Sequence, residues 1–229
     1  MTEFPEPSII YQDENIVAAN KPAGLLVHGL SGKDMGPTLA EWVVRKYPET
    51  KEVGDDPQNR PGVVHRLDKE TSGIIILARN QKYFSYLKSL FQNHKMEKKY
   101  LAWVYGVPKD KKIRINIPIG IRSGSVHRSV HSGKMSKEAV TDYSVKECKE
   151  YNGRKICLVE VFPKTGRTHQ IRVHLASIGH PVVGDAIYGG KMGRDDSGGM
   201  RLHAYSLEFE IQPGRKILLE AEPPKSFDP

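Results

Sequence analysis

Short runs in which apolar or β-branched residues alternate with polar ones recur along the chain, and they constrain its fold more than any other feature. Such runs predict strands, and they lie at residues 8–11, 16–19, 73–78, 100–105, 113–117, 141–147, 156–162, 205–211 and 216–220. Helical periodicity occurs at residues 38–47, 81–94 and 168–178. Because a helix does not follow each strand, we expect an α+β fold and not a doubly wound parallel sheet.

Size and composition fit a globular protein with one large domain or two small ones. The chain has 229 residues, of which 38% are hydrophobic, enough for a core. No apolar run approaches the roughly 18 residues of a membrane span, and the first residues lack the blocks of a signal peptide. We therefore expect a cytoplasmic protein with no membrane contact. Cys148 and Cys157 form no Cys-x-x-Cys pair, so two thiols are expected and not a disulfide or a thiolate metal site.

Positive charge is concentrated in the middle of the sequence. The net charge is +8, and residues 61–140 carry 16 Lys and Arg against 5 Asp and Glu. This excess of +11 favours a polyanionic partner, although a solvated basic face fits the charge equally well. Within it, residues 120–133 are expected to form a basic loop or hairpin without a clear register. The Gly- and Asp-rich residues 189–199 are expected to form a mobile surface loop.

The stretch HRLDKETSG, residues 65–73, places a carboxylate at the mouth of an apolar run. Desolvating a charge costs free energy unless the group is paired or used. In an extended conformation Arg66 and Asp68 share one side of the chain. The opposite side carries Val63, His65 and Leu67. On this pattern alone a surface ion pair explains the Arg-x-Asp as well as a site does.

A second polar stretch runs from Lys164 to His174. Thr165 or Thr168 can cap the helix that follows, and Arg167 lies just before its first turn. Free backbone N–H groups favour anions there, so Arg167 could meet a phosphate or a carboxylate. Alternatively its guanidinium covers apolar surface or pairs with Asp185.

Tyr100 begins a predicted strand in which apolar and polar residues alternate, and it directly follows two lysines, Lys98 and Lys99. This arrangement suits an aromatic platform for a nucleobase, but a core tyrosine fits the pattern as well.

Histidine spacing argues against a metal site. His169 and His174 are separated by about 140° on a helix, so they do not share a face. His127 and His131 are four residues apart, a spacing that would place them on one face of a helix. They lie, however, in a Gly- and Ser-rich segment without an intervening glutamate.

Taken together and in this order, the motifs resemble those of the RluA-type pseudouridine synthases over nearly the whole chain. The motifs are residues 11–25, 65–73, 98–106, 137–143, 166–175, 179–189 and 201–204. The resemblance implies a mixed, largely antiparallel sheet with flanking helices and a central basic cleft. It implies one catalytic domain over residues 1–229, without the N-terminal S4 RNA-binding domain of many members. It also implies isomerisation of uridine to pseudouridine in ribosomal (large-subunit) or transfer RNA, by a monomer with no cofactor and no metal.

The resemblance also assigns residues. The catalytic aspartate of the family matches Asp68, its active-site tyrosine matches Tyr100, and its basic residue matches Arg167. Asp68 is expected to act at the ribose, either by attacking C1′ or by taking the C2′ proton, and both routes stay open. The expected substrate-binding residues are Arg66, which resembles an arginine that fills the space left by a flipped base, His65, Ile171 and Leu202.

Two other classes of function compete with this hypothesis. An RNA-binding or ribosome-assembly factor could use the same fold without catalysis. The presence of Asp68, Tyr100 and Arg167 disfavours that reading. A hydrolase of free nucleosides is disfavoured because a small neutral substrate does not require the charge of residues 61–140.

Overall fold

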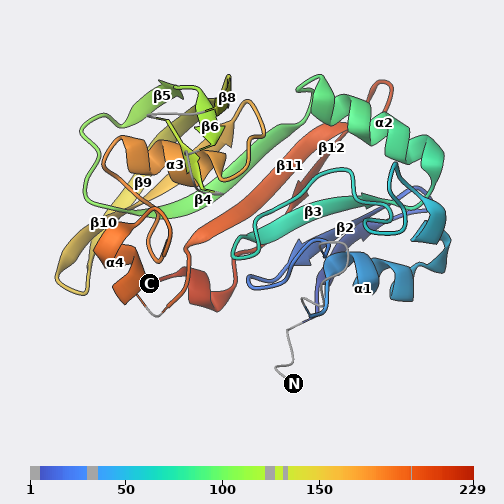
Figure 1. Ribbon diagram of the computed structural model, residues 1–229, viewed down its shortest axis with the longest axis horizontal. Helices are drawn as coiled ribbons and strands as arrows, with labels where there is room; N and C mark the ends of the chain where they lie inside the picture. Colours follow the sequence, from blue (N-terminus) through green and yellow to red (C-terminus); the bar gives the residue numbers. More distant parts are fainter. Residues whose placement is uncertain (1–5, 30–35, 122–126, 131–133, 197) are drawn as a thin grey trace. The chain divides into compact units, whose positions relative to one another are not determined.

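The computed structural model describes residues 6–29, 36–121, 127–130, 134–196 and 198–229. The chain forms two compact units (Figure 1). Unit 1 comprises residues 1–97 and 204–223, and unit 2 comprises residues 98–203 and 224–229. Each unit is described separately below.

The sheet of unit 1 is built from strands near both ends of the chain. The strands are β1 (Ser8–Gln12), β2 (Ile16–Lys21), β3 (Ser72–Ala78), β11 (Leu202–Gln212, which begins two residues before the unit boundary) and β12 (Arg215–Glu220). β2 pairs antiparallel with both β1 and β3, and β11 pairs antiparallel with β12. The unit also contains α1 (Leu39–Lys46), the 3-10 helix η1 (Pro48–Glu52) and α2 (Gln81–Gln92).

Local sequence explains why these elements begin where they do. Thr38 and Glu41 form a reciprocal capping box at the start of α1, and the Asn80 side chain caps α2. All seven residues of β3 are buried, as expected for a central strand. Gly73 on β3 has a φ of +114°, and a Cβ there would lie 2.3 Å from the carbonyl oxygen of Ala204 on β11. Only glycine permits this close approach.

Unit 2 contains a sheet with the strand order β4-β10-β9-β5. Its strands, β4 (Glu97–Tyr105), β5 (Lys112–Asn116), β9 (Val140–Tyr151) and β10 (Arg154–Pro163), pair antiparallel. Helix α3 (Gln170–Ser177) covers this sheet (Figure 1) and buries Ile171 and Leu175 in its core. The short elements α4 (Gly190–Asp195) and η2 (Lys225–Phe227) also belong to this unit.

A small second sheet, which we call the arm, also belongs to unit 2. It has the order β7-β6-β8 and consists of β6 (Ile119–Ile121), β7 (Arg128–Ser129) and β8 (Lys134–Lys137). Within the residues that the structure describes, the segment expected to form a basic loop or hairpin is therefore part of a three-stranded sheet. Residues 122–126 and 131–133 of that expectation lie outside the described residues.

The hairpin β9–β10 turns at Asn152 and Gly153, whose φ angles of 48° and 69° fit a type I′ turn. Its register pairs Cys148 with Cys157, and the two residues form a disulfide with a Cα–Cα distance of 4.0 Å. The expectation of two free thiols is therefore wrong. The reason is that the turn places the two cysteines directly opposite each other on neighbouring strands.

The α+β class expected from the sequence is confirmed, and the main strands and helices lie where their periodicity places them. The expectation of a mobile loop over residues 189–199 is wrong for residues 190–195, which form α4. The glycines of this segment allow the close packing, because a Cβ on Gly193 would lie 2.1 Å from the carbonyl oxygen of Asp185. Among the described residues, no helix is both long and apolar enough to cross a membrane.

Candidate active site

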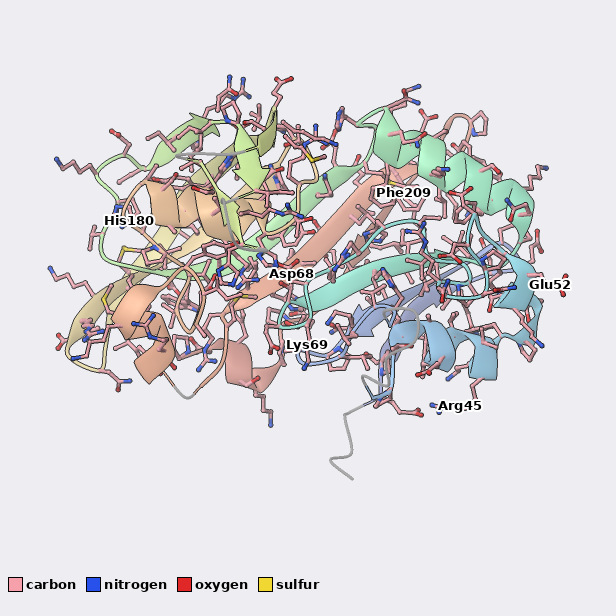
Figure 2. The ribbon with its side chains drawn as sticks, viewed as in Figure 1. Arg45, Glu52, Asp68, Lys69, His180 and Phe209 are labelled. Carbon is pink, nitrogen blue, oxygen red and sulfur yellow. A yellow bond between two sulfur atoms is a disulfide. The ribbon has the colours of Figure 1, made fainter. Side chains whose placement is uncertain are left out.

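Asp68 lies in unit 1, on the loop that leads into β3 (Figure 2). Its residue is half-buried, and its backbone carbonyl accepts a hydrogen bond of 3.1 Å from the N–H of Thr71. Arg66 is exposed and Leu67 is buried, as the expected alternation requires. Residues 64–71 nevertheless form a loop and not a strand. A carboxylate on such a loop needs a fixed backbone if it is to act on one atom of a substrate.

The buried Lys21 supplies that fixed backbone. Its Nζ donates to the carbonyl oxygens of Pro22, Leu25 and Lys69, at 2.9, 2.8 and 3.1 Å. The N–H of Gly24 also donates to the carbonyl of Lys69, at 2.8 Å. The loop that follows β2 is therefore tied to the residue directly after Asp68.

The charge of Lys21 is held in an unusual environment. Lys21 has no exposed surface, and this burial lowers its pKa to about 7. The negative charges of Glu70 and Asp68 act in the opposite direction and raise the pKa, but by less. The sequence pattern assigned Lys21 no role. The available signal was a lysine at the end of an otherwise apolar strand, where a charge is costly without partners.

His65 is held by the scaffold of unit 1. Its Nε2 accepts the backbone N–H of Ile76 on β3 at 2.9 Å, which fixes the tautomer with the proton on Nδ1. Its ring stacks on Phe91 of α2 with centroids 4.4 Å apart. These contacts brace the loop before Asp68, and the substrate-binding role of His65 stays a prediction.

Three of the expected site residues gather in the core of unit 2. Ile171 on α3 and Leu202 at the start of β11 are buried in one apolar cluster, and the half-buried Tyr100 on β4 packs against it. Tyr100 is held in register opposite Val161 of β10. The structure thus brings together an aromatic ring and two aliphatic side chains, which suits contact with a planar base.

Arg167 lies in the turn between β10 and α3, and Gln170 organises this turn. The Gln170 Oε1 accepts the backbone N–H of Arg167 at 2.9 Å and the hydroxyl of Thr165 at 2.7 Å. Its Nε2 donates to the carbonyl of Val140 and to the hydroxyl of Thr141, both at 3.0 Å. Every polar group of this buried amide is used. The sequence offered little signal for this role, because two of the partners, Val140 and Thr141, are distant in the chain.

Two further contacts hold the Arg167 turn. The Arg167 Nε donates to the carbonyl of Glu138 at 2.9 Å. The Nζ of Lys98 donates to the carbonyl of Thr165 at 3.2 Å. Burial, with a smaller effect of the Lys164 charge, lowers the pKa of Lys98 to about 8. The turn is therefore fixed from both sides.

Two expectations about this turn are wrong. Neither Thr165 nor Thr168 caps α3, because the N-cap is His169, in the left-handed conformation with a φ of 56° and without a side-chain cap. The alternative pairing of Arg167 with Asp185 is also wrong. The Asp185 carboxylate accepts a bidentate pair of hydrogen bonds from Arg172, from Nε to Oδ2 at 2.7 Å and from Nη2 to Oδ1 at 2.9 Å.

Histidines in unit 2 serve structural contacts. His174 is fully buried, and its ring nitrogens lie 2.9 Å from the hydroxyl of Thr141 and 2.9 Å from the carbonyl oxygen of Ile117. Burial lowers the pKa of His174, although the contact with Ile117 opposes the shift. Over the described ranges, no three His, Cys, Asp or Glu side chains group in a way that suits a metal ion.

Comparison with known proteins gives a consistent result. A family model described as RNA pseudouridylate synthase matches residues 15–177. An uncharacterized RNA pseudouridine synthase of Aquifex aeolicus is 39% identical, over 96% of this chain and 70% of its own length. The ribosomal large subunit pseudouridine synthase D of Borreliella burgdorferi is 33% identical, over 96% of this chain and 66% of its own length.

A solved structure agrees with these sequence matches. Human RNA Pseudouridylate Synthase Domain Containing 1 superposes with a TM-score of 0.81 at 28% identity, over 100% of this chain and 89% of that chain.

Proposed function

The chain belongs to the RNA pseudouridylate synthase family and is of the RluA type, and from this we propose that it converts specific uridines of large-subunit ribosomal RNA to pseudouridine. The named activity of the Borreliella burgdorferi relative supports ribosomal RNA as the substrate class. Transfer RNA is the second candidate substrate. We further propose that the protein acts as a monomer, without a metal, in the cytoplasm, where these RNA substrates are made and used.

The observation that carries the proposal is the construction of the Asp68 loop. A half-buried aspartate follows an exposed arginine, and the next residue is tied to a buried lysine through its carbonyl. A surface ion pair does not require this scaffold. A carboxylate that must meet one carbon of a ribose does.

In the proposed reaction Asp68 acts at the ribose of the target uridine. Its carboxylate either attacks C1′ or takes the C2′ proton, and the bond between C1′ and N1 breaks with uracil as a delocalised anion. The base then rotates and joins C1′ through C5. On the first route this breaks the bond between Asp68 and C1′, and on the second Asp68 returns the proton to C2′. C5 then loses its proton, and N1 gains one. Because the leaving group is already stabilised, one acting carboxylate suffices, whereas a glycosidase typically uses two.

The remaining residues are proposed to hold the substrate. The target base must leave its stack to be reached, and Arg66 would fill the space that it vacates. Tyr100 would lie against the flipped base, with Ile171 and Leu202 as apolar walls, and His65 would support the loop beside it. Arg167 would supply the basic group of the active site, as the family motif implies.

The test is single-turnover conversion by Asp68→Asn. This change is nearly isosteric and removes the charge, so RNA should still bind while pseudouridine formation falls by several orders of magnitude. Glu70→Gln is the matched control, since it removes an exposed carboxylate from the same loop and should convert at nearly the wild-type rate. Folding is checked by circular dichroism.

The competing outcomes are distinct. Conversion by Asp68→Asn within about tenfold of wild type would remove Asp68 from the chemistry, because loss of a reacting group costs far more. A wild-type protein that binds RNA but forms no pseudouridine in total ribosomal and transfer RNA would support the assembly-factor reading instead.

A further inference from the structure

A groove of unit 2 runs between the arm and the turn that carries Arg167. It has a volume of about 300 Å³, at the lower end of the range for ligand pockets. It is lined by Ile119, Gly120, Ile121, Arg128, Met135, Lys137, Gly166, Arg167 and Thr168. We call it the arm groove. Its residues come from β6, β7, β8 and the Arg167 turn, segments that are separated in the sequence.

The lining of the arm groove has charge of one sign. Arg128 from β7, Lys137 from β8 and Arg167 from the turn all contribute, and the described lining residues include no acidic side chain. Glu138, the nearest acidic residue in sequence, takes part through its carbonyl, which accepts the Arg167 Nε. Three cations around one concave surface raise the local concentration of an anion, and arginine suits a phosphate in particular.

Both walls of the arm groove are fixed before any ligand binds. The backbone N–H of Arg128 donates to the hydroxyl of Tyr188 at 3.0 Å. The opposite wall is held by Gln170, which accepts the N–H of Arg167 at 2.9 Å. β6 pairs with both β7 and β8, and the Arg167 Nε donates to the carbonyl of Glu138, directly after β8, so the arm and the turn are held as one surface. A fixed surface loses less free energy on binding than a mobile cationic loop.

From this geometry we propose that the arm groove binds the phosphodiester backbone of the substrate RNA next to the target uridine, with Arg128 and Lys137 as phosphate ligands beside Arg167. The position next to the target rests on the proposed function, because Arg167 is assigned there to the active site. Phosphate contacts of this kind set the register of an RNA without reading its bases. Arg128 and Lys137 are therefore positioning residues for the RNA and take no part in the bond changes.

The test measures the salt dependence of binding for Arg128→Gln, Lys137→Gln and the double variant. The probe is a fluorescent fragment of large-subunit ribosomal RNA, followed by anisotropy. Each lost phosphate contact should reduce the log–log salt slope by about 0.7 on single-stranded RNA, and the double variant should lose about twice that. Lys155→Gln is the matched control, because Lys155 is an exposed residue of the same unit outside the arm groove, and its slope should equal that of wild type.

A second measurement separates this proposal from the proposed function. Single-turnover conversion at saturating RNA should stay near the wild-type rate in both single variants, while the RNA concentration needed for half-maximal conversion rises. If wild type converts uridine but the variants keep the full salt slope, the arm groove proposal is wrong and the proposed function stands. If wild type forms no pseudouridine and the slopes fall as expected, RNA binding in the groove stands and the proposed function fails.

The alternative occupant, an acidic protein surface, is tested with polyglutamate. Binding of polyglutamate that depends on Arg128 and Lys137, together with RNA binding that does not, would overturn the assignment to RNA. Circular dichroism and urea unfolding confirm that each variant is folded, so that a changed slope reports lost contacts.

Discussion

The hydroxyl of Tyr188 accepts the backbone N–H of Arg128 at 3.0 Å. The same hydroxyl lies 2.9 Å from Nδ1 of His169, at the N-cap of α3. One oxygen therefore joins strand β7 of the arm to the turn that carries Arg167. Tyr188 is itself fixed, because its backbone N–H donates to Oδ1 of Asp185 at 3.0 Å.

Tyr188→Phe should weaken RNA binding without removing a charge. The ring is retained, but the N–H of Arg128 loses its acceptor and the arm loses its link to His169. A neutral hydrogen bond contributes about 1 kcal/mol, so we expect an RNA dissociation constant about fivefold higher. Anisotropy measures this change. Tyr151→Phe is the control, because among the described residues the hydroxyl of Tyr151 has one hydrogen bond, a long contact of 3.5 Å with Asp196. Equal affinities for the two variants would contradict a coupling role for Tyr188.

Asp185→Asn should destabilise the protein by about 3–5 kcal/mol, because it removes the carboxylate that pairs with the buried guanidinium of Arg172. The side chains of Arg172 and Asp185 are only 5% and 0% exposed. Urea unfolding at pH 7 measures the loss. The control is Asp142→Asn, which breaks the exposed pair with Arg114 and should cost less than about 1 kcal/mol. Similar losses of unfolding free energy for both variants would show that burial of the Arg172–Asp185 pair does not increase its contribution to stability.

The same pair predicts a pH dependence of stability. Burial raises the pKa of Asp185, but the Arg172 guanidinium and the N–H groups of Tyr188 and Ile187 outweigh it, so the pKa lies below its usual value of 3.8. As the pH falls, the unfolded state binds this proton first. The stabilisation is therefore complete at neutral pH and is lost as the pH falls through the folded-state pKa. Below pH 3.8 the unfolding free energy of wild type should fall more steeply than that of Asp185→Asn.

Lys21→Met should lower both stability and activity. Methionine has a similar length but donates no hydrogen bonds, so the carbonyls of Pro22, Leu25 and Lys69 lose the Nζ that now binds them. The contact with the Leu25 carbonyl is buried, whereas the Lys69 carbonyl keeps the N–H of Gly24. A buried group left unsatisfied costs about 1–3 kcal/mol, and we expect a loss of stability of that size. Conversion should also slow, because the loop of Asp68 loses its anchor.

The control for Lys21 is Lys69→Met, which removes an exposed lysine side chain from the same loop but keeps its carbonyl. The unfolding free energy and the conversion rate of this variant should equal those of wild type. Denaturant titration and single-turnover conversion measure the two effects. A Lys21→Met protein as stable as wild type would show that the three carbonyls find other partners.

The strands and helices could be predicted because their periodicity follows from burial on one face, as in β9 and β10. The disulfide could have been predicted from the same hairpin. The Asn152–Gly153 turn lies midway between Cys148 and Cys157, so an antiparallel register has to pair them. Spacing of the cysteines alone does not carry this information, because it requires the position of the turn.

The candidate site was predictable only in part. Tyr100, Ile171 and Leu202 share one core as the family motifs imply, because these motifs mark fixed places in a fold. The roles of Gln170 and Tyr188 could not be predicted, and for Lys21 the only signal was a charge at the end of an apolar strand. Each of the three depends in part on a backbone carbonyl or N–H group of a distant segment, and backbone groups leave no trace in a sequence pattern.

The β9–β10 hairpin also has a consequence for how the protein folds. Its strands are adjacent in sequence and joined by a two-residue turn, so little chain entropy is lost when it closes, and hairpins of this kind form in about 1–10 μs. The partner β4, which pairs with β10 across a gap of about fifty residues, has to close a much longer loop. We therefore expect the hairpin to form early and to serve as the template on which β4, and then the Arg167 turn, assemble.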